Sequence, residues 1–180
     1  MKKLKSFQPI SSKNARILIL GSMPGQRSLD AGQYYAHPRN NFWRIMEEVT
    51  GLKASAGYDE RLLFLKERGI ALWDVLHSCH RKGSLDAAIR GRSVKVNDFN
   101  SFFQRHPGIH TVLLNGAAAE GYYRRYVVPD LESTAMNLLR MPSTSPAHAA
   151  MSFRQKLSAW RKGVEALHIA APDHVKKRGD

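Results

Sequence analysis

The chain has 180 residues and a mass of 20.3 kDa, which suits one domain with its own hydrophobic core. It carries 28 Lys and Arg against 15 Asp and Glu, and this formal excess of +13 favours a polyanionic partner, with solubility charge or an anionic membrane surface as alternatives. No apolar run is long enough to span a bilayer, and the basic start MKKLKSF lacks the hydrophobic stretch of a secretory signal. The single cysteine, Cys79, excludes an internal disulfide and a cysteine-held iron–sulfur cluster. We therefore expect a cytoplasmic protein.

Strand and helix patterns alternate along the chain. The predicted order is a basic arm (1–15), a buried strand (17–20), two helices (39–49 and 59–68), a strand (70–76), a helix (97–105), a strand (111–114), a helix (117–126), a strand (136–141), a helix (145–167) and a basic tail (168–180). This alternation predicts an α/β fold, a three-layer α/β/α sandwich with a mostly parallel central sheet of about four strands. We expect a single domain over 1–180 whose arm and tail are mobile.

The segment after the first strand is the strongest candidate for chemistry. The turn GSMPG runs from Gly21 to Gly25, and the loop that follows carries Tyr34, Tyr35, His37 and Asn40. Loops at the carboxyl ends of parallel strands commonly bind ligands. A structural loop with packed aromatic rings is the alternative.

Phe42 begins the next helical pattern and allows two interpretations. It can anchor the core or offer a stacking platform to a ligand, and the apolar spacing of the helix favours the core.

Polar residues also end the later strands. Asp74 interrupts an apolar strand, so it faces a polar cavity or accepts structural backbone hydrogen bonds. Asn115 can contact a ligand or cap the next helix, and capping is the simpler interpretation. Ser143 and Thr144 precede Ser145, the expected N-cap of the last helix, and their extra hydroxyls favour phosphate binding there.

One cluster suggests a metal, namely His77, Cys79 and His80. Its spacing is not that of paired zinc ligands, so a basic loop near phosphate over 77–82 is the favoured interpretation, and we expect no metal.

Four motifs together resemble a known family. They are GSMPG at 21–25, YYAHPRNNFW at 34–43, WDV at 73–75 and PSTSPAH at 142–148. On these residues the chain resembles the uracil-DNA glycosylase superfamily, most closely its hypoxanthine-DNA glycosylase branch (family 6), which is related to the mismatch-specific uracil/thymine glycosylases.

The resemblance implies specific roles. Met23 stands where much of the superfamily has the Asp or Asn that activates water, so the asparagine of the HPxN motif, Asn40, takes the catalytic role; Asn41 is chemically identical, and motif register selects Asn40. The implied base pocket comprises Gly21, Ser22, Met23, Pro24, Gly25, Tyr35, His37, Phe42, Asp74 and Asn115. The implied DNA backbone and wedge contacts are Ser143, Thr144, Ser145, Pro146, Ala147 and His148.

The implied activity is hydrolysis of the N-glycosidic bond of hypoxanthine (deoxyinosine) in DNA, which leaves an abasic site. No lysine occupies a motif position, so a monofunctional enzyme without a cofactor is expected. The partner would be double-stranded DNA, with single-stranded DNA left open, and the protein would be a nucleoid-associated monomer without membrane contact. Two alternatives remain: a mismatch-specific uracil-DNA glycosylase, and an inactive DNA-binding module with the same fold.

Overall fold

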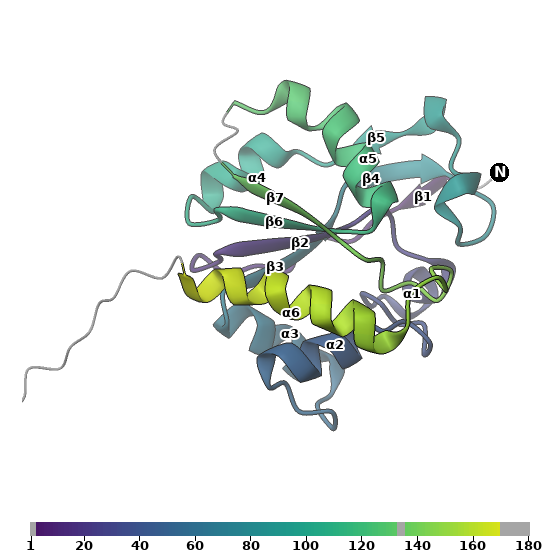
Figure 1. Ribbon diagram of the computed structural model, residues 1–180. Coiled ribbons are helices and arrows are strands. Elements are labelled where there is room, and N and C mark those ends of the chain that lie inside the picture. The colour runs from purple at the N-terminus through teal and green to yellow at the C-terminus, as the bar shows by residue number, and fades with distance from the viewer. Residues whose placement is uncertain (1–2, 133–135, 170–180) are drawn as a thin grey trace, which may run out of the picture.

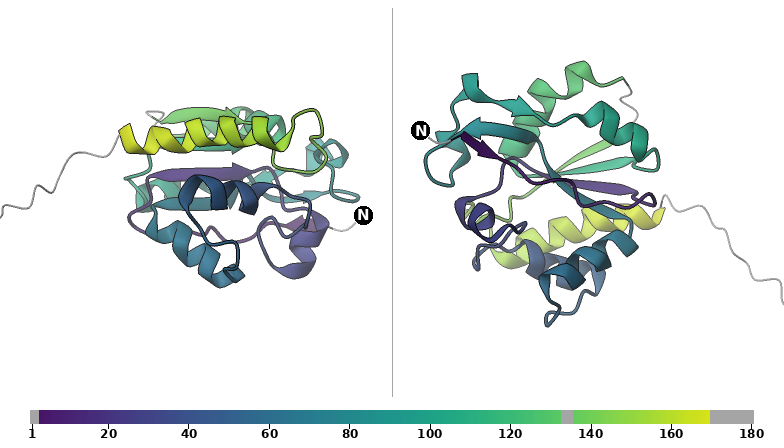
Figure 2. Two further views of the ribbon diagram at one scale, coloured as in Figure 1. Left: turned by 60° about the horizontal axis from the view of Figure 1, so that its bottom comes forward. Right: turned by 180° about the vertical axis from the view of Figure 1, so that it is seen from behind.

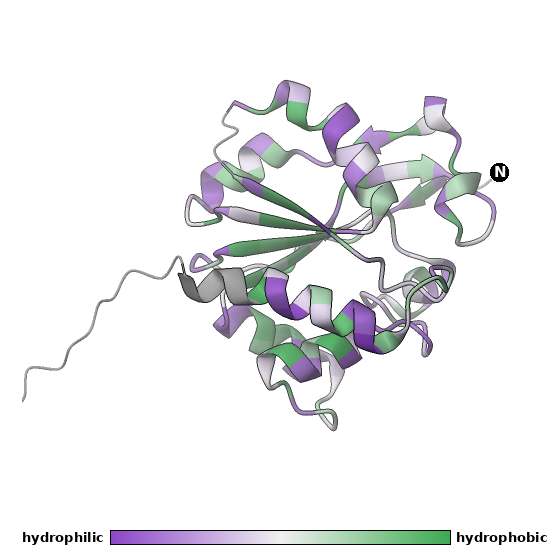
Figure 3. Cartoon of the chain, viewed as in Figure 1, coloured by the Kyte–Doolittle hydropathy of each residue, from purple (hydrophilic) through white to green (hydrophobic). Residues whose placement is uncertain are grey.

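A four-stranded parallel sheet forms the centre of the protein. The computed structural model describes residues 3–132 and 136–169. The sheet has the order β3-β2-β6-β7 and consists of β2 (Ile17–Gly21), β3 (Ile70–Asp74), β6 (Thr111–Asn115) and β7 (Asn137–Met141) (Figure 1). β2 and β3 are fully buried, as their continuous apolar sequences require when both faces are covered. These strands are among the most hydrophobic segments of the chain (Figure 3).

Helices cover both faces of this sheet. α4 (Phe99–Arg105) and α5 (Ala117–Tyr126) pack on one face, and α2 (Phe42–Thr50), α3 (Tyr58–Glu67) and α6 (Phe153–Ile169) pack on the other (Figure 2). Successive residues of β2 alternate between the two cores, because side chains of a strand point to opposite faces in turn. The predicted α/β/α sandwich with about four parallel strands is therefore confirmed.

A second, smaller sheet was not predicted. β4 (Leu76–His80) pairs antiparallel with β1 (Lys3–Lys5) and with β5 (Lys95–Val96). The prediction of a mobile arm is therefore wrong for residues 3–15, because β1 is paired and Ile10 bridges Leu72 by backbone hydrogen bonds of 2.9 and 2.8 Å. Residues 170–180 of the predicted tail lie outside the described residues, and residues 168 and 169 belong to α6.

The predicted basic loop over 77–82 is also corrected by β4. Cys79 is buried beside Leu4, whereas the adjacent His80 is partly exposed. Because adjacent strand residues face opposite sides, these side chains diverge. Among the side chains that the structure describes, within residues 3–132 and 136–164, no three of His, Cys, Asp or Glu are arranged to hold a metal ion. In the same ranges, no helix has both the length and the apolar character needed to cross a bilayer.

The ends of two helices differ from prediction. α4 is capped by Asp98, whose Oδ1 accepts from the Ser101 N–H at 3.0 Å, rather than by Asn97. α6 begins at Phe153, so residues 142–152 form a loop and Ser145 is not its N-cap. Ser152 and Gln155 cap α6 reciprocally: the Ser152 N–H donates to Gln155 Oε1 at 2.8 Å, and the Gln155 N–H donates to Ser152 Oγ at 3.3 Å. The proposed phosphate site at a helix N-terminus beginning at Ser145 therefore does not exist.

Candidate active site

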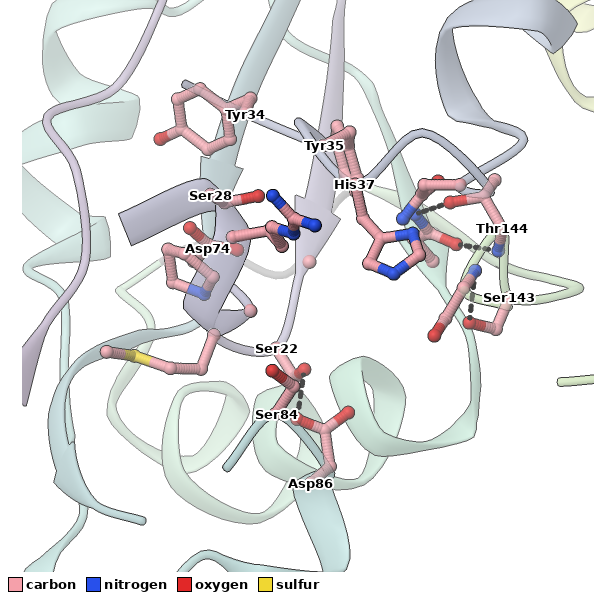
Figure 4. A pocket seen from close by; sticks show the side chains of 18 of the residues that line it. Ser22, Ser28, Tyr34, Tyr35, His37, Asp74, Ser84, Asp86, Ser143 and Thr144 are labelled. Carbon is pink, nitrogen blue, oxygen red and sulfur yellow. Dashed lines mark hydrogen bonds between the residues drawn. The ribbon is translucent and has the colours of Figure 1, made fainter. Parts of the chain in front are cut away.

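A cavity of about 150 Å³ opens at the carboxyl edge of the parallel sheet (Figure 4). Most predicted site residues line it, namely Gly21, Ser22, Met23, Pro24, Gly25, Tyr35, His37, Asn40, Asp74, Asn115, Ser143, Thr144, Ser145 and Pro146. Six further residues line it that were not predicted as site residues: Gln26, Arg27, Ser28, Tyr34, Ser84 and Asp86. Phe42, Ala147 and His148 do not line it. The carboxyl ends of all four strands of the parallel sheet, or the loops that follow them, thus converge on one cavity.

The turn at Gly21 leaves room for a carboxyl group. Gly21 pairs with Asp74 at the ends of β2 and β3, and the Val75 N–H donates to the Gly21 carbonyl at 2.8 Å. A Cβ atom on Gly21 would lie only 2.5 Å from Asp74 Oδ1. Only glycine fits at this position while the Asp74 side chain lies beside it.

Asp74 is a buried acid without a full set of partners. Asp74 is 4% exposed, and its Oδ2 atom has no hydrogen-bond partner among the described residues. Burial raises the pKa of the Asp74 carboxyl to about 8, the nearby Asp86 carboxylate adds to this rise, and Arg81 opposes it. The carboxyl group is therefore mostly neutral at pH 7, and its O–H and carbonyl oxygen can donate and accept one hydrogen bond each.

A buried arginine holds the turn that forms one side of the cavity. Arg81 is 4% exposed, donates from Nη2 to the Pro24 carbonyl and from Nε to the Gly83 carbonyl at 2.9 Å. Its Nη1 lies 3.9 Å from Asp86 Oδ1, which in turn accepts from Ser22 Oγ at 2.8 Å. These contacts fix the backbone of the turn at a defined distance from the cavity.

Tyr35 presents its ring to the cavity on a strained backbone. Its φ of 56° lies in the left-handed region, which a bulky non-glycine residue rarely adopts and which is often kept for a functional reason. The ring stacks on Phe42 with centroids 3.9 Å apart and planes 19° apart. Phe42 is 0% exposed, so the expectation that Phe42 contacts a base is wrong: it supports the Tyr35 ring from behind.

Asn40 is oriented by the start of α2. Its Oδ1 accepts from the Phe42 N–H at 3.0 Å, so Nδ2 points the other way. No hydrogen bond among the described residues uses Nδ2. Asn41 does not line the cavity, and its backbone N–H donates to the Thr144 carbonyl at 3.0 Å. Of the two adjacent asparagines, only Asn40 is placed to touch a ligand in the cavity.

The opposite side of the cavity is held by an amide and a hydroxyl. Asn115 Nδ2 donates to Thr144 Oγ1 at 3.0 Å, and the Thr144 N–H donates to Asn115 Oδ1 at 2.9 Å. Asn115 therefore caps no helix; it fastens the loop after β7 to the end of β6. Farther along this loop, the buried Lys156 donates from Nζ to the His148 carbonyl at 2.7 Å, which ties His148 to α6 instead of the cavity.

Only a weak feature of the sequence indicates that Ser84 and Asp86 belong to the site. They belong to a loop that leaves β4, and the cue is the polar Ser84-Leu85-Asp86 segment after a buried strand end. Because β4 was not predicted, the direction in which this loop returns could not be foreseen. Ser84 Oγ accepts from the Gln26 N–H at 3.0 Å, which brings the loop against α1 (Gln26–Ala31).

The arrangement offers one reaction geometry. A flat ligand in the cavity could contact the Tyr35 ring, the neutral donor–acceptor pair of Asp74 and the amide of Asn40, because all three line it. An amide next to the cavity can orient water, and no lysine is among the described residues that line it. These groups suit hydrolysis of a planar substrate without a covalent amine intermediate.

Comparison with known proteins gives a consistent result. The family model of the uracil DNA glycosylase superfamily matches residues 8–166. A Methanosarcina barkeri protein named hypoxanthine DNA glycosylase is 35% identical over 164 residues, which are 91% of this chain and 99% of the relative. A protein of the same name from Methanosarcina acetivorans is 32% identical over 157 residues, 87% and 94% of the two chains. A solution NMR structure from Methanosarcina acetivorans, described as a candidate uracil DNA glycosylase, has a TM-score of 0.73 at 29% identity and covers 89% of this chain and 98% of its own.

Proposed function

Because the chain belongs to the uracil DNA glycosylase superfamily, we propose that it removes hypoxanthine from deoxyinosine in DNA. The chain is a DNA glycosylase by its family and by relatives of nearly the same length. The observation that carries the choice of reaction is a single cavity that combines Asn40, the Tyr35 ring and the buried Asp74 carboxyl. We propose that one domain, acting as a monomer, performs the reaction on duplex DNA.

The target nucleotide must leave the stack to reach this cavity. A mispaired or damaged base costs less to extrude, which favours lesions over normal pairs. The Tyr35 ring receives the extruded base by stacking, which contributes about 1–3 kcal/mol for a base on an aromatic side chain. Phe42 makes this platform rigid, because the two rings are already stacked.

Asp74 is the group that reads the base edge in this proposal. Hypoxanthine presents an N1–H donor beside its O6 acceptor. A neutral carboxyl donates to O6 from its O–H and accepts from N1–H at its carbonyl oxygen, so both groups are satisfied. The ionised carboxylate would place a negative charge against O6. Burial, which keeps Asp74 protonated, therefore selects a base with an N–H beside a carbonyl.

Hydrolysis then needs a water molecule at the sugar. Asn40 accepts the Phe42 N–H with one lone pair of Oδ1, which leaves the second lone pair to accept from a water. The water oxygen bonds to C1′, the electron pair of the C1′–N9 bond departs with the base, and the proton of the water neutralises the released base. Backbone N–H groups of the turn at Ser22 to Gly25 stabilise the negative charge that develops on the base.

DNA is held from the loop after β7 in this account. Ser143 and Ser145 lie at the cavity and supply hydroxyl donors for the phosphates that flank the extruded nucleotide. Pro146 lines the cavity, and the exposed Ala147 next to it faces the duplex. The reciprocal bonds between Asn115 and Thr144 keep this loop in place.

Uracil is the second candidate base. Its N3–H and O4 present the same donor–acceptor pair to Asp74 as hypoxanthine does, so the geometry of the cavity favours both. The choice between them depends on size, because a purine has a second ring to accommodate. We place hypoxanthine first because two relatives at 32–35% identity are named for it.

A base-release assay tests this proposal. Duplexes carrying a single deoxyinosine, deoxyuridine or deoxyxanthosine are incubated with the protein, and the free base is measured by chromatography. We expect release of hypoxanthine and an abasic strand that stays intact until alkali is added. Asn40→Ala should slow release by about a hundredfold or more with little change in DNA binding. Asn41→Ala, which alters a neighbour outside the cavity, is the matched control and should keep the rate.

Two results would contradict the proposal. Release of uracil without hypoxanthine would make the chain a uracil glycosylase. DNA binding without release of any base, unchanged by Asn40→Ala, would make it a binding module.

A further inference from the structure

Leu85 is a large apolar side chain at the rim of the cavity. It is 60% exposed, more than Leu63 (57%) and Leu139 (37%), the other large hydrophobic residues exposed in the described chain. Its two neighbours, Ser84 and Asp86, both line the cavity, whereas Leu85 itself does not. Its side chain therefore projects from the rim toward solvent, one residue from the opening.

The segment that carries Leu85 is fixed to the body of the protein. We call residues 82–94, which join β4 to β5, the rim loop. On one side of Leu85, Ser84 Oγ accepts from the Gln26 N–H at 3.0 Å, and on the other side Asp86 Oδ1 accepts from Ser22 Oγ at 2.8 Å. In Figure 1 this loop lies at the same side of the molecule as α1 and the loop that precedes α6.

Further bonds close the base of the rim loop. The Ala88 N–H donates to the Leu85 carbonyl at 3.0 Å within the turn η1 (Asp86–Ala88), and Arg81 forms an isolated bridge with Ile89. The Arg90 N–H donates to the His80 carbonyl at 3.0 Å. Leu85 thus stands on a braced turn, so little conformational freedom is lost if its side chain enters a partner.

The charge around Leu85 suits nucleic acid. Exposed basic residues lie before and after Leu85 along the rim loop and in β5, and none forms a salt bridge within the described residues; they are Lys82, Arg90, Arg92 and Lys95. An isolated apolar side chain on a surface is ordinary by itself. Here it is combined with unpaired positive charge and with the opening that would receive an extruded base. Binding to another protein or to a lipid surface would not require Leu85 to lie beside this opening.

We propose that Leu85 is a wedge that enters the DNA stack beside the extruded nucleotide. Extrusion leaves a gap between neighbouring base pairs, and an apolar side chain that fills the gap prevents the base from returning. From the other side of the cavity, the loop after β7 offers only Pro146 and the small Ala147. Leu85 supplies the volume that these two residues lack. This inference rests on the proposed glycosylase function.

The test compares duplex with single-stranded DNA. Single-turnover release of hypoxanthine is measured on both substrates for the natural protein, for Leu85→Ala and for Leu63→Ala. Leu63 is an equally exposed leucine on α3 and is the matched control. Leu85→Ala should slow release from the duplex about tenfold or more, because the buried methyl and methylene contacts of the wedge are lost. Release from the single strand, which has no gap to fill, should stay the same for every variant.

A second readout does not depend on base release. A duplex with 2-aminopurine next to the deoxyinosine reports unstacking by a rise in fluorescence when protein binds. The natural protein and Leu63→Ala should produce this rise, and Leu85→Ala should not. If Leu85→Ala gives the same fluorescence rise as the natural protein, or slows both substrates equally, the wedge is refuted. If no base is released but the fluorescence difference appears, the proposed catalysis fails and the wedge stands.

Discussion

Replacing Asp74 by asparagine tests whether the buried carboxyl of Asp74 is protonated in the folded protein. Asparagine has nearly the same shape as aspartic acid and cannot ionise. Burial raises the pKa of Asp74 from 3.8 to about 8, so the native protein holds a proton there that the unfolded chain releases above pH 3.8. The free energy of unfolding of the natural protein must then fall as the pH rises from about 4 to about 8. The variant Asp74→Asn cannot ionise at this position, so its free energy of unfolding does not show this fall.

The size of the effect follows from the linkage between proton binding and folding. One proton held by the native state alone changes the free energy of unfolding by about 1.4 kcal/mol per pH unit. About 3 pH units separate the ordinary carboxyl value from pH 7, so the penalty at neutral pH is about 4 kcal/mol. We expect Asp74→Asn to equal the natural protein near pH 4, to exceed its stability by about that amount at pH 7, and to gain nothing further above pH 8.

Urea denaturation followed by tryptophan fluorescence measures this difference at each pH from 4 to 9. The three tryptophans of the chain include Trp73, next to the mutated residue, and Trp160 in the opposite core. A natural protein that gains stability over Asp74→Asn as the pH rises would refute the reasoning, because it would show an ionised and well-paired Asp74. The rate of hypoxanthine release gives a second profile: it should fall above about pH 8 for the natural protein and stay level for Asp74→Asn, whose amide also donates and accepts.

Four further predictions concern single residues. Asp98→Ala should lower stability more at pH 7 than in acid, because hydrogen bonds from Ser101 hold the pKa of Asp98 below its ordinary value of 3.8 and this contribution is lost as the pH falls through that lowered pKa; thermal melts at pH 7 and across the acid range check this. Tyr35→Ala should slow hypoxanthine release about tenfold or more, as expected for a lost stacking contact, while Tyr35→Phe keeps the single-turnover rate. Gly116→Ala should destabilise by about 1–3 kcal/mol, because its φ is +97° and the new Cβ would lie 2.8 Å from Ser143 Cβ. Gly121→Ala on α5, where a Cβ meets nothing within 4 Å, should instead stabilise by roughly 0.5–1 kcal/mol, and equal urea midpoints for the two variants would contradict both expectations.

The parallel sheet was predictable because its sequence signal is local. A strand covered on both faces is expected to be apolar over most of its length, and the runs Ile17–Leu20 and Val112–Leu114 meet that requirement. The helix face that contains Phe42 was likewise visible as a 3.6-residue repeat, and the core position of Phe42 follows from it. Since the ends of parallel strands share one edge, the convergence of Gly21, Asp74 and Asn115 could be expected from the sequence.

The second sheet and the late start of α6 depend on distant contacts. β1 has three residues and β4 reads LHSCH, so neither has a run or an alternation that distinguishes it from a loop. Ser145 followed by Pro146 is a good start for a helix by local rules. The chain instead has to pass from the sheet edge to the far face before α6 can pack, and Asn115 and Lys156 hold it in that extended path. No signal within the loop itself reports these two partners.

The buried acid explains why the cavity has its surrounding charges. An ionisable group without partners lowers stability, so its presence indicates a task that an apolar residue cannot perform. Burial raises the pKa of Asp74 most, the nearby Asp86 carboxylate raises it further and Arg81 lowers it, so these two charges adjust how firmly the proton is held. Arg81 donates hydrogen bonds to backbone carbonyls of the turn, and its Nη1 lies 3.9 Å from Asp86 Oδ1. Its positive charge therefore lies next to the Asp86 carboxylate. Burial and Asp86 therefore keep Asp74 in the neutral form that reads the base, and the contacts of Arg81 shape the turn beside it.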